Sequence, residues 1–244
     1  MVDHLEFASP ALIDTFLQVW RHTGNQRFGW MIGRYAPYEE VPMGIKAIVE
    51  AIHEPPQDGD LDGLSLDLPW EDQTRIENLA KAAGLTIVGV IFTDLTPMPE
   101  DKTKSICKRH QDSHFLSSLE TIFAASLQRD RPVPSRSSPT GSFASRLVTA
   151  VLSGTPEGGV DVSAYMASEQ ACAMVEADMI EASVEPGIVR LKEADEGRYI
   201  PDVFYRFKNE YKIEVKQSAK PCFPVEYLLV NVSCVSSSVV TRIS

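Results

Sequence analysis

The sequence predicts an α/β fold in which helices flank a strand-rich sheet. Residues 86–91 are apolar and rich in β-branched side chains, and Gly84 and Pro97 bound them, as expected of a buried strand. Between Pro10 and Gly24 the apolar residues instead recur at helical spacing. Because both patterns occur along the same chain, strands and helices are expected to share one fold.

Two helices and three strands are expected before residue 95. Ser9 and Pro10 form a helix start, and Gly24 ends that helix. Its apolar side chains are Ile13, Phe16, Leu17 and Trp20. A second helix is expected over residues 70–83, ending at Gly84. Its apolar face is expected to hold Ile76, Leu79 and Ala83. The expected strands cover residues 27–35, 44–54 and 86–91.

The second half of the chain predicts two more helices and several strands. Ser117 and Glu120 form a capping box, which starts a helix expected over residues 117–128. Ser168 starts another, expected to continue to about Ile180. Strands with alternating polarity are expected at 146–152 and 160–167, with a hairpin turn at 155–159. The remaining expectations are a loop at 186–197 and strands at 210–217 and 224–232.

Three long inserts interrupt this plan, near residues 58–69, 96–114 and 129–145. Loops of this length are either functional or disordered, and without further information disorder is the simpler reading. The serine-rich end of the chain, residues 233–244, has no clear pattern and is expected to be a disordered tail. The rest, residues 1–232, is expected to form one domain.

The composition excludes several classes of function. The 244 residues carry a net charge of −11, from 23 Lys and Arg against 34 Asp and Glu. Such a chain is not expected to bind nucleic acid, although the charge suits either a basic partner or a solvated acidic surface. No apolar run is long enough for a transmembrane segment, and the first residues do not resemble a signal peptide. Four scattered cysteines without a C-x-x-C pair indicate reduced, cytoplasmic or nuclear thiols.

Individual polar residues give weak signals of chemistry. His110 and His114 could bind a metal together, but the favoured interpretation is that they are two solvated histidines in a charged loop. Asp94, at the end of the central strand, could be a functional carboxylate or a cap for the following loop. Ser117 lies in no G-x-S-x-G motif, so no serine hydrolase is indicated.

Several motifs occur in the order typical of one family. They are Met1–His4, Arg27–Gly29, Gly33–Tyr35, Glu54–Gln57, Gly89–Leu95, Phe115–Ser118, Tyr199–Tyr205 and Pro224–Leu228. From residue 1 to about 232 the chain resembles the nuclear protein localisation protein 4 family, whose members act with the AAA ATPase called valosin-containing protein. The residues after Val232 depart from the family pattern.

The resemblance implies an MPN domain, the fold of JAMM-type deubiquitinases, with its metal site lost. Active members use a Glu, a His-x-His pair and a Ser-x-x-Asp. These positions fall on Gln26, on Phe92 and Asp94, and on Glu120, of which only Glu120 keeps the expected chemistry. A catalytic zinc needs about three protein ligands and a base. The resemblance therefore implies no catalytic residues, no metal and no cofactor.

The resemblance also implies a role in ubiquitin-dependent degradation, including ER-associated degradation. The expected partners are ubiquitin, polyubiquitin chains, the ubiquitin-fusion-degradation protein 1 partner and the AAA ATPase. A groove lined by the inserts would hold an unfolded ubiquitin segment. The family docks on the ATPase through an upstream zinc-finger region without a counterpart here, so direct docking is not expected. Expected locations are the cytoplasm, the nucleus, and the surfaces of the endoplasmic reticulum and nuclear membrane, with a role in nuclear pore, protein and mRNA transport.

Two rival functions remain open at this point. One is an active metallo-isopeptidase with a non-standard metal set, such as Asp94, Glu120 and a loop histidine. The other is a degenerate scaffold without partners. Metal analysis separates the first rival from an adaptor, and a pull-down with the ubiquitin-fusion-degradation protein 1 partner separates the second.

Overall fold

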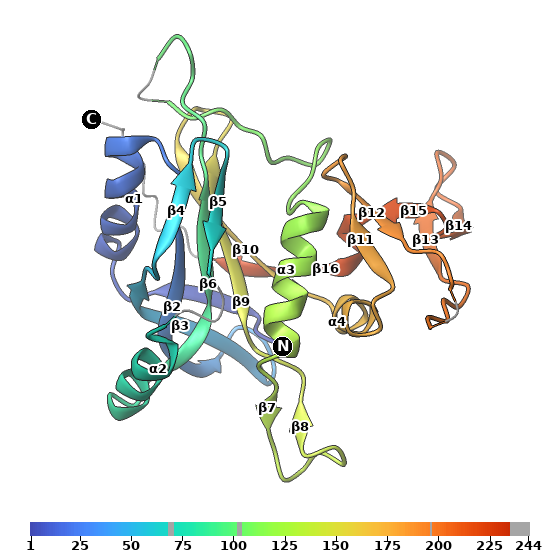
Figure 1. Cartoon of the computed structure of the whole chain (residues 1–244), viewed down its shortest axis with the longest axis horizontal. Helices are drawn as coiled ribbons and strands as arrows, with labels where there is room; N and C mark the ends of the chain where they lie inside the picture. Colours follow the sequence, from blue (N-terminus) through green and yellow to red (C-terminus); the bar gives the residue numbers. More distant parts are fainter. Residues whose placement is uncertain (68–70, 102–103, 196, 235–244) are drawn as a thin grey trace. The chain divides into compact units, whose positions relative to one another are not determined.

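The computed structural model describes residues 1–67, 71–101, 104–195 and 197–234, and the chain divides into two compact units (Figure 1). The first unit comprises Met1–Lys108, Ser145–Met166 and Asn231–Ser244. The second unit comprises Arg109–Ala144 and Ala167–Val230. The predicted mixed α/β architecture is confirmed, with many strands and few helices.

The main sheet, in the first unit, closes into a barrel. Its strands are β1 (His4–Phe7), β2 (Phe28–Tyr38), β3 (Gly44–His53), β6 (Thr86–Asp94), β9 (Val148–Gly154), β10 (Val160–Ala167) and β16 (Leu229–Cys234). Around the barrel they follow the order β1-β16-β10-β9-β6-β2-β3. The pairs β2/β3, β2/β6 and β9/β10 are antiparallel, whereas β6/β9, β1/β3 and β1/β16 are parallel. The expected sheet is therefore present as a closed barrel.

The central strand β6 is buried on both faces. Every residue from Ile87 to Thr93 is buried, which explains its near-continuous apolar sequence. Its neighbour β2 shifts register between Ile32 and Gly33 against β3. A Cβ atom on Gly33 would lie 1.9 Å from the carbonyl oxygen of Ile48, so only glycine permits this close approach.

Two helices belong to the first unit. In α1 (Ala11–Thr23), the residues predicted from helical spacing are buried: Ile13, Phe16, Leu17 and Trp20. Gly24 ends α1 in the left-handed conformation, with φ 76°. The prediction for α2 (Gln73–Ala82) was partly wrong. Leu79 is 67% exposed and Ala83 is exposed, whereas Ala80 is the buried residue; Trp70 lies outside the described residues.

The first insert contains an ordered hairpin, which corrects the expectation of a loop near residues 58–69; residues 68 and 69 lie outside the described residues. Strands β4 (Gln57–Asp60) and β5 (Gly63–Leu66) pair in antiparallel register. The backbone N–H of Gln26 donates to the carbonyl oxygen of Asp60 at 2.9 Å. The side chain of Gln57 bonds both the N–H and the carbonyl oxygen of Phe28, at 2.7 and 2.8 Å. These bonds join residues distant in sequence, so no local pattern revealed the hairpin.

The described part of the second insert, residues 96–101 and 104–114, has the expected irregular backbone, but it is anchored. Pro97 and Ser105 form an isolated antiparallel bridge. Ser105 is fully buried, and its N–H donates to the carbonyl oxygen of Gly158 at 3.0 Å. The part near Ser105 therefore packs as part of the first unit.

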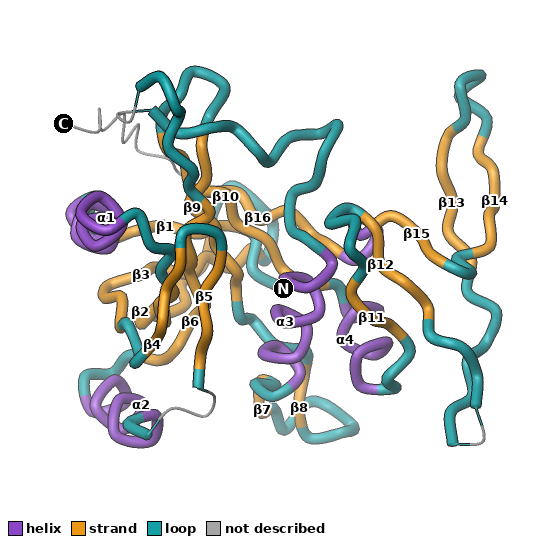
Figure 2. Tube along the Cα trace, turned by 45° about the horizontal axis from the view of Figure 1, so that its top comes forward, coloured by secondary structure: helices purple, strands orange, loops and turns teal. Residues whose placement is uncertain are grey.

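The second unit packs two helices with small sheets, and Figure 2 shows these elements by type. The two α-helices among its described residues are α3 (Ser118–Arg129) and α4 (Glu169–Glu176), and a 3₁₀ turn, η1, covers Val225–Leu228. Strands β11 (Ile180–Ala182), β12 (Ile188–Leu191) and β15 (Cys222–Pro224) form one antiparallel sheet. Two hairpins complete the unit: β7 (Val133–Pro134) with β8 (Ser142–Phe143), and β13 (Phe204–Lys208) with β14 (Glu214–Ser218).

Several predicted boundaries in this unit were wrong. The helix expected to reach Ile180 ends at Glu176, because Asp178 takes a left-handed conformation with φ 51° and turns the chain into β11. The loop at 186–197 contains β12, and the insert at 129–145 contains the β7–β8 hairpin. The strand expected at 210–217 starts later, as β14, and the one expected at 224–232 begins as η1 before β16.

Ser233 and Cys234, expected in the tail, belong to β16, and residues 235–244 lie outside the described residues. No helix in the described part of the chain combines the length and the apolar character that crossing a bilayer requires.

Candidate functional site

The side chain of Gln26 is the centre of a buried hydrogen-bond network just before β2. Gln26 is 4% exposed. Its Nε2 group donates to the carbonyl oxygens of Leu61 and Leu95, both at 2.8 Å. Its Oε1 atom accepts from the Thr93 hydroxyl at 2.8 Å and from the Leu95 N–H at 3.1 Å. The carboxamide thus makes two bonds as donor and two as acceptor, which uses its whole capacity.

Thr93 and Trp20 extend the Gln26 network to β2 and α1. The Thr93 hydroxyl accepts from the N–H of Arg27 at 2.8 Å while it donates to Gln26. The indole N–H of Trp20 donates to the carbonyl oxygen of Leu95 at 3.2 Å. Because each of these hydrogen bonds is buried or part-buried, the network fixes the end of β6 against α1 and β2.

Phe92 lies in β6, where it is 8% exposed. Its backbone neighbours in the sheet are Phe28 of β2 and Val151 of β9. Phe28 in turn packs edge-to-face against Trp30, with ring centroids 5.6 Å apart. Phe92 is thus part of an apolar layer, and its ring offers no atom that could bind a metal.

Asp94 is the last residue of β6, and its carboxylate forms an ion pair with Lys108. The Nζ atom of Lys108 lies 3.4 Å from Asp94 and 3.3 Å from Asp62, which stands in the turn between β4 and β5. Since successive strand residues point to opposite faces, Phe92 and Asp94 share one face of β6 and Thr93 lies on the other. The carboxylate of Asp94 therefore takes part in an ion pair that joins the second insert to the barrel.

Glu120 belongs to the second unit and has a structural role there. Its carboxylate accepts from the N–H of Ser117 at 2.7 Å, and its own N–H donates to the Ser117 hydroxyl at 3.2 Å, so the predicted capping box is present. The guanidinium of Arg109 bonds both carboxylate oxygens, at 2.8 and 2.6 Å. The side chain of Arg109 is only 5% exposed, and it also donates to the carbonyl oxygen of Phe115.

Sequence reasoning missed Arg109 and Lys108. Both stand in the irregular insert, and each pairs with a carboxylate more than ten residues away. No spacing rule connects such positions. The only local signal was the presence of basic residues in an insert that precedes a helix with an acidic first turn.

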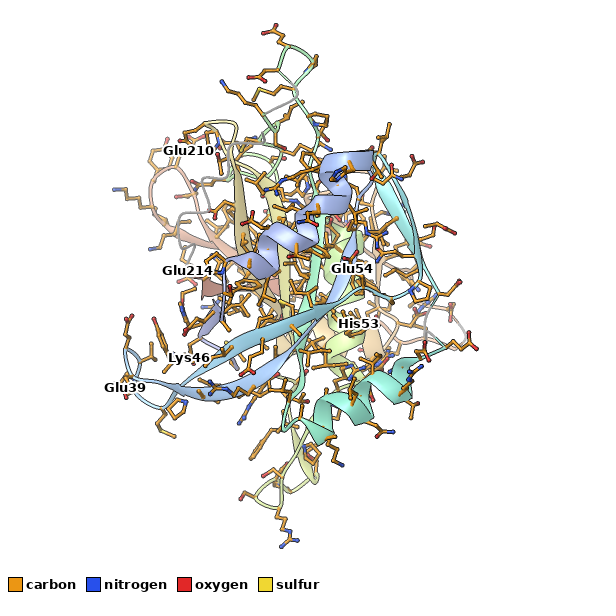
Figure 3. All side chains as sticks on the ribbon, turned by 90° about the vertical axis from the view of Figure 1, so that its left-hand side faces the viewer. Glu39, Lys46, His53, Glu54, Glu210 and Glu214 are labelled. Atoms are coloured by element: carbon orange, nitrogen blue, oxygen red, sulfur yellow. The ribbon has the colours of Figure 1, made fainter. Side chains whose placement is uncertain are left out.

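The histidines and Glu54 form no additional site with these residues. His110 is exposed, and His114 bonds the hydroxyl of its neighbour Ser113 at 3.0 Å. Glu54, labelled with His53 at the end of β3 in Figure 3, accepts from Arg27 at 2.7 Å. Among the described residues there is no group of three His, Cys, Asp or Glu side chains arranged to hold a metal ion.

The residues that the resemblance assigns to a metal site do not fit a catalytic zinc. Phe92 lacks a ligand atom, and both acceptor sites of the Gln26 oxygen are used by protein donors. Lys108 and Arg109 compete with any metal for Asp94 and Glu120. Three free ligands and a general base, which zinc hydrolysis requires, are not provided by this set.

Comparison with known proteins places these features in a family. Residues 27–241 match the model of the NPL4 family. The Nuclear protein localization protein 4 of Yarrowia lipolytica is 50% identical over 237 residues, covering 96% of this chain and 42% of the relative. The proteins of the same name from Saccharomyces cerevisiae and Schizosaccharomyces pombe are 47% and 44% identical, each again over 96% of this chain and 40% and 41% of the relative.

The chain therefore spans about two fifths of the length of the curated relatives that it matches. The family match covers most of the chain, and the identity holds along nearly all of it. On these grounds the chain belongs to the NPL4 family.

Proposed function

We propose that residues 1–232 carry an MPN-type domain without catalytic activity, which serves as a ubiquitin-binding adaptor. The observation that supports this most is the carboxamide of Gln26. At the position where active MPN proteins use a glutamate base, this chain has a neutral amide whose four hydrogen-bonding sites are all occupied. An amide cannot take a proton from water, and this one is held away from solvent.

The adaptor role rests on the family. The relatives are named for nuclear protein localization, and family membership supports a cofactor role in the ubiquitin-dependent pathway. With the ubiquitin-fusion-degradation protein 1 partner, the chain would present polyubiquitylated substrates to the valosin-containing-protein AAA ATPase, for unfolding and proteasomal degradation, including ER-associated degradation. It would act in the cytoplasm and nucleus and at the surfaces of the endoplasmic reticulum and nuclear membrane. A role in nuclear transport belongs to the same proposal.

The substrate groove would be bordered by the second insert, near residues 96–114. Because Ser105 is buried, deleting the whole second insert would damage the barrel, so a smaller change tests the groove. Pro97 and Ser105 already pair, which allows residues 98–104 to be replaced by a two-residue turn. This variant should keep its melting temperature and bind polyubiquitylated substrate more weakly; unchanged binding would remove this insert from the groove.

Two assays test the proposal as a whole. The purified chain should co-precipitate with the ubiquitin-fusion-degradation protein 1 partner and with polyubiquitin. It should release no ubiquitin from chains after incubation with zinc. Failure to bind both partners would overturn the adaptor role, whereas chelator-sensitive cleavage with stoichiometric zinc would establish the rival metallo-isopeptidase.

A further inference from the structure

The β13–β14 hairpin of the second unit presents an outer face that its own fold does not use. Among the described residues, β13 and β14 pair only with each other. Side chains alternate along β13: Tyr205 points inward, 5.0 Å from the Tyr227 ring and 6.2 Å from the Phe223 ring. Phe204 and Arg206 are exposed on the opposite face. The inner face thus anchors the hairpin to the core, and the outer face remains in solvent.

The outer face brings two cations together. Arg206 and Lys216 are directly opposite each other in the antiparallel register. Like charges at such positions destabilise a hairpin. Arg206 also reaches Glu214 at 3.2 Å, and Nζ of Lys216 lies 3.9 Å from the centre of the Phe204 ring. These contacts offset the repulsion only in part, because both cations stay on the same exposed face.

The local charge opposes that of the whole chain. Residues 204–218 include four basic and two acidic side chains, whereas the chain carries a net charge of −11. Glu214 on β14 and Glu210 in the turn are the two acidic members (Figure 3). A basic face on an acidic protein attracts acidic ligands at short range and gives electrostatic complementarity to one kind of partner.

Apolar side chains surround these cations. Phe204 is 47% exposed, Ile213 is 60% exposed and Tyr211, in the turn, is 80% exposed. The turn is nevertheless well formed, since Oδ1 of Asn209 accepts from the N–H groups of Tyr211 and Ile213, both at 3.0 Å. Exposed aromatic residues beside an arginine have the composition of the energetic centre of a protein interface.

We propose that the outer face of β13–β14 binds an extended, acidic protein segment with interspersed apolar residues. Carboxylates of the segment would lie between Arg206 and Lys216 and relieve their repulsion, and its apolar side chains would cover Phe204. The hairpin suits an extended ligand, because a strand-like peptide has the same length and residue spacing as β13 and β14 and can lie along an edge of the pair that no other described strand occupies. This assignment adds a docking surface to the adaptor role and does not depend on it.

A nucleic acid fits this face less well. Its outer side chains include three cations, Arg206, Lys208 and Lys216, beside the carboxylate of Glu214. A long polyanion would meet this carboxylate and the net negative charge of the rest of the chain. A short acidic segment needs to satisfy only the local cations.

A fluorescein-labelled peptide of alternating glutamate and valine residues tests the proposal with the full chain. Fluorescence anisotropy at low salt should show binding that weakens as salt is added. The double variant Arg206→Glu/Lys216→Glu should bind at least about tenfold more weakly. Phe204→Ala should also weaken binding, because it removes the apolar contact. The matched control is Arg75→Glu/Lys81→Glu, which reverses two exposed charges of α2 and should leave binding unchanged.

Melting temperatures establish that the variants are folded, and Lys216→Gln replaces the double variant if that one unfolds. No measurable binding by the parent chain, or an equal loss in the α2 control, would overturn the proposal. So would equal binding of a peptide with lysine in place of glutamate. Tighter binding of a single-stranded RNA with the same loss in the hairpin variants would assign the face to nucleic acid instead.

Discussion

The carboxamide oxygen of Gln26 accepts a hydrogen bond of 2.8 Å from the hydroxyl of Thr93, 67 residues away in the sequence. This bond joins the approach to β2 with the end of β6. The same carboxamide donates to two carbonyl oxygens. The neutral carboxamide therefore holds separate segments of the chain together through hydrogen bonds. A carboxylate at this position would place a negatively charged oxygen against those two carbonyl oxygens.

Replacing Gln26 by glutamate should destabilise the protein. The substitution would place a buried carboxylate against the carbonyl oxygens of Leu61 and Leu95, and both would lose the donor that Gln26 supplies, although the indole of Trp20 still donates to Leu95. We expect a loss of about 3 kcal/mol in the free energy of unfolding, measured in urea. Gln18→Glu makes the same chemical change on the exposed side of α1 and should alter stability little. A Gln26→Glu variant that keeps its stability and binds zinc would contradict this account.

Truncating Phe92 should leave a cavity in the barrel. Because Phe92 is 8% exposed, Phe92→Ala should lower the free energy of unfolding by about 3–5 kcal/mol. Phe143→Ala is the matched control, since that ring is 51% exposed and its loss should cost far less. If Phe92→Ala matches the parent in stability but loses ubiquitin binding, the ring is a recognition residue and not a packing residue.

Placing a histidine at position 92 should not create a metal site. Phe92→His would bury an imidazole without an assured partner, so it should also destabilise the barrel. It should bind no zinc, because Asp94 and Glu120 remain paired with Lys108 and Arg109. Metal content of the purified variant, measured after dialysis against zinc, decides this; one zinc per chain would refute it.

Neutralising Glu120 should destabilise the second unit. Glu120→Gln keeps the shape but leaves the guanidinium of Arg109, which is 5% exposed, without its counter-charge. The expected loss is about 3 kcal/mol. Glu181→Gln breaks the exposed pair with Arg190 and should cost less than about 0.5 kcal/mol. Equal effects of the two substitutions in chemical denaturation would show that the burial of Arg109 is unimportant.

The half-buried thiols of Cys172 and Cys234 should react slowly. Burial raises the pKa of Cys234 to about 12 from its ordinary 9.0, and burial also raises the pKa of Cys172. Since the thiolate is the reactive form, iodoacetamide at pH 8 should label both far more slowly in the folded protein than in denaturant. The raised pKa of Cys234 also means that its contribution to stability is complete below pH 9 and is lost as the pH rises towards 12. Rapid labelling of Cys234, followed by mass spectrometry, would contradict its burial.

Elements with a local cause could be predicted from the sequence. The capping box of Ser117 and Glu120, the apolar stripe of α1 and the continuous apolar run of β6 each depend on neighbouring residues, and each was recognised. The β4–β5 hairpin was missed, because its Asp- and Gly-rich sequence lacks alternation and its order comes from bonds to Gln26 and Phe28. Contacts with residues distant in the sequence, and not the β-strand propensity of the local sequence, determine the structure of this hairpin.

The resemblance singles out Gln26, Phe92, Asp94 and Glu120, but the partners of these side chains could not be predicted from the sequence. That Phe92 cannot bind a metal follows from its chemistry alone. That Gln26 bonds Leu61, Thr93 and Leu95, or that Glu120 holds Arg109, depends on how distant segments meet. The sequence thus gives the chemistry of each side chain, whereas the structure gives its hydrogen-bond and ion-pair partners.

The position of β16 in the barrel has a consequence for synthesis of the chain. β16 lies between β1 and β10, and His4 pairs with Ser233, 229 residues later. One edge of β1 thus stays unpaired on the ribosome until almost the whole barrel sequence has been made, which takes roughly 10–50 s at ordinary rates of synthesis. During that time the nascent chain exposes an open strand edge, to which another chain could add. Protection by chaperones would matter most in this interval.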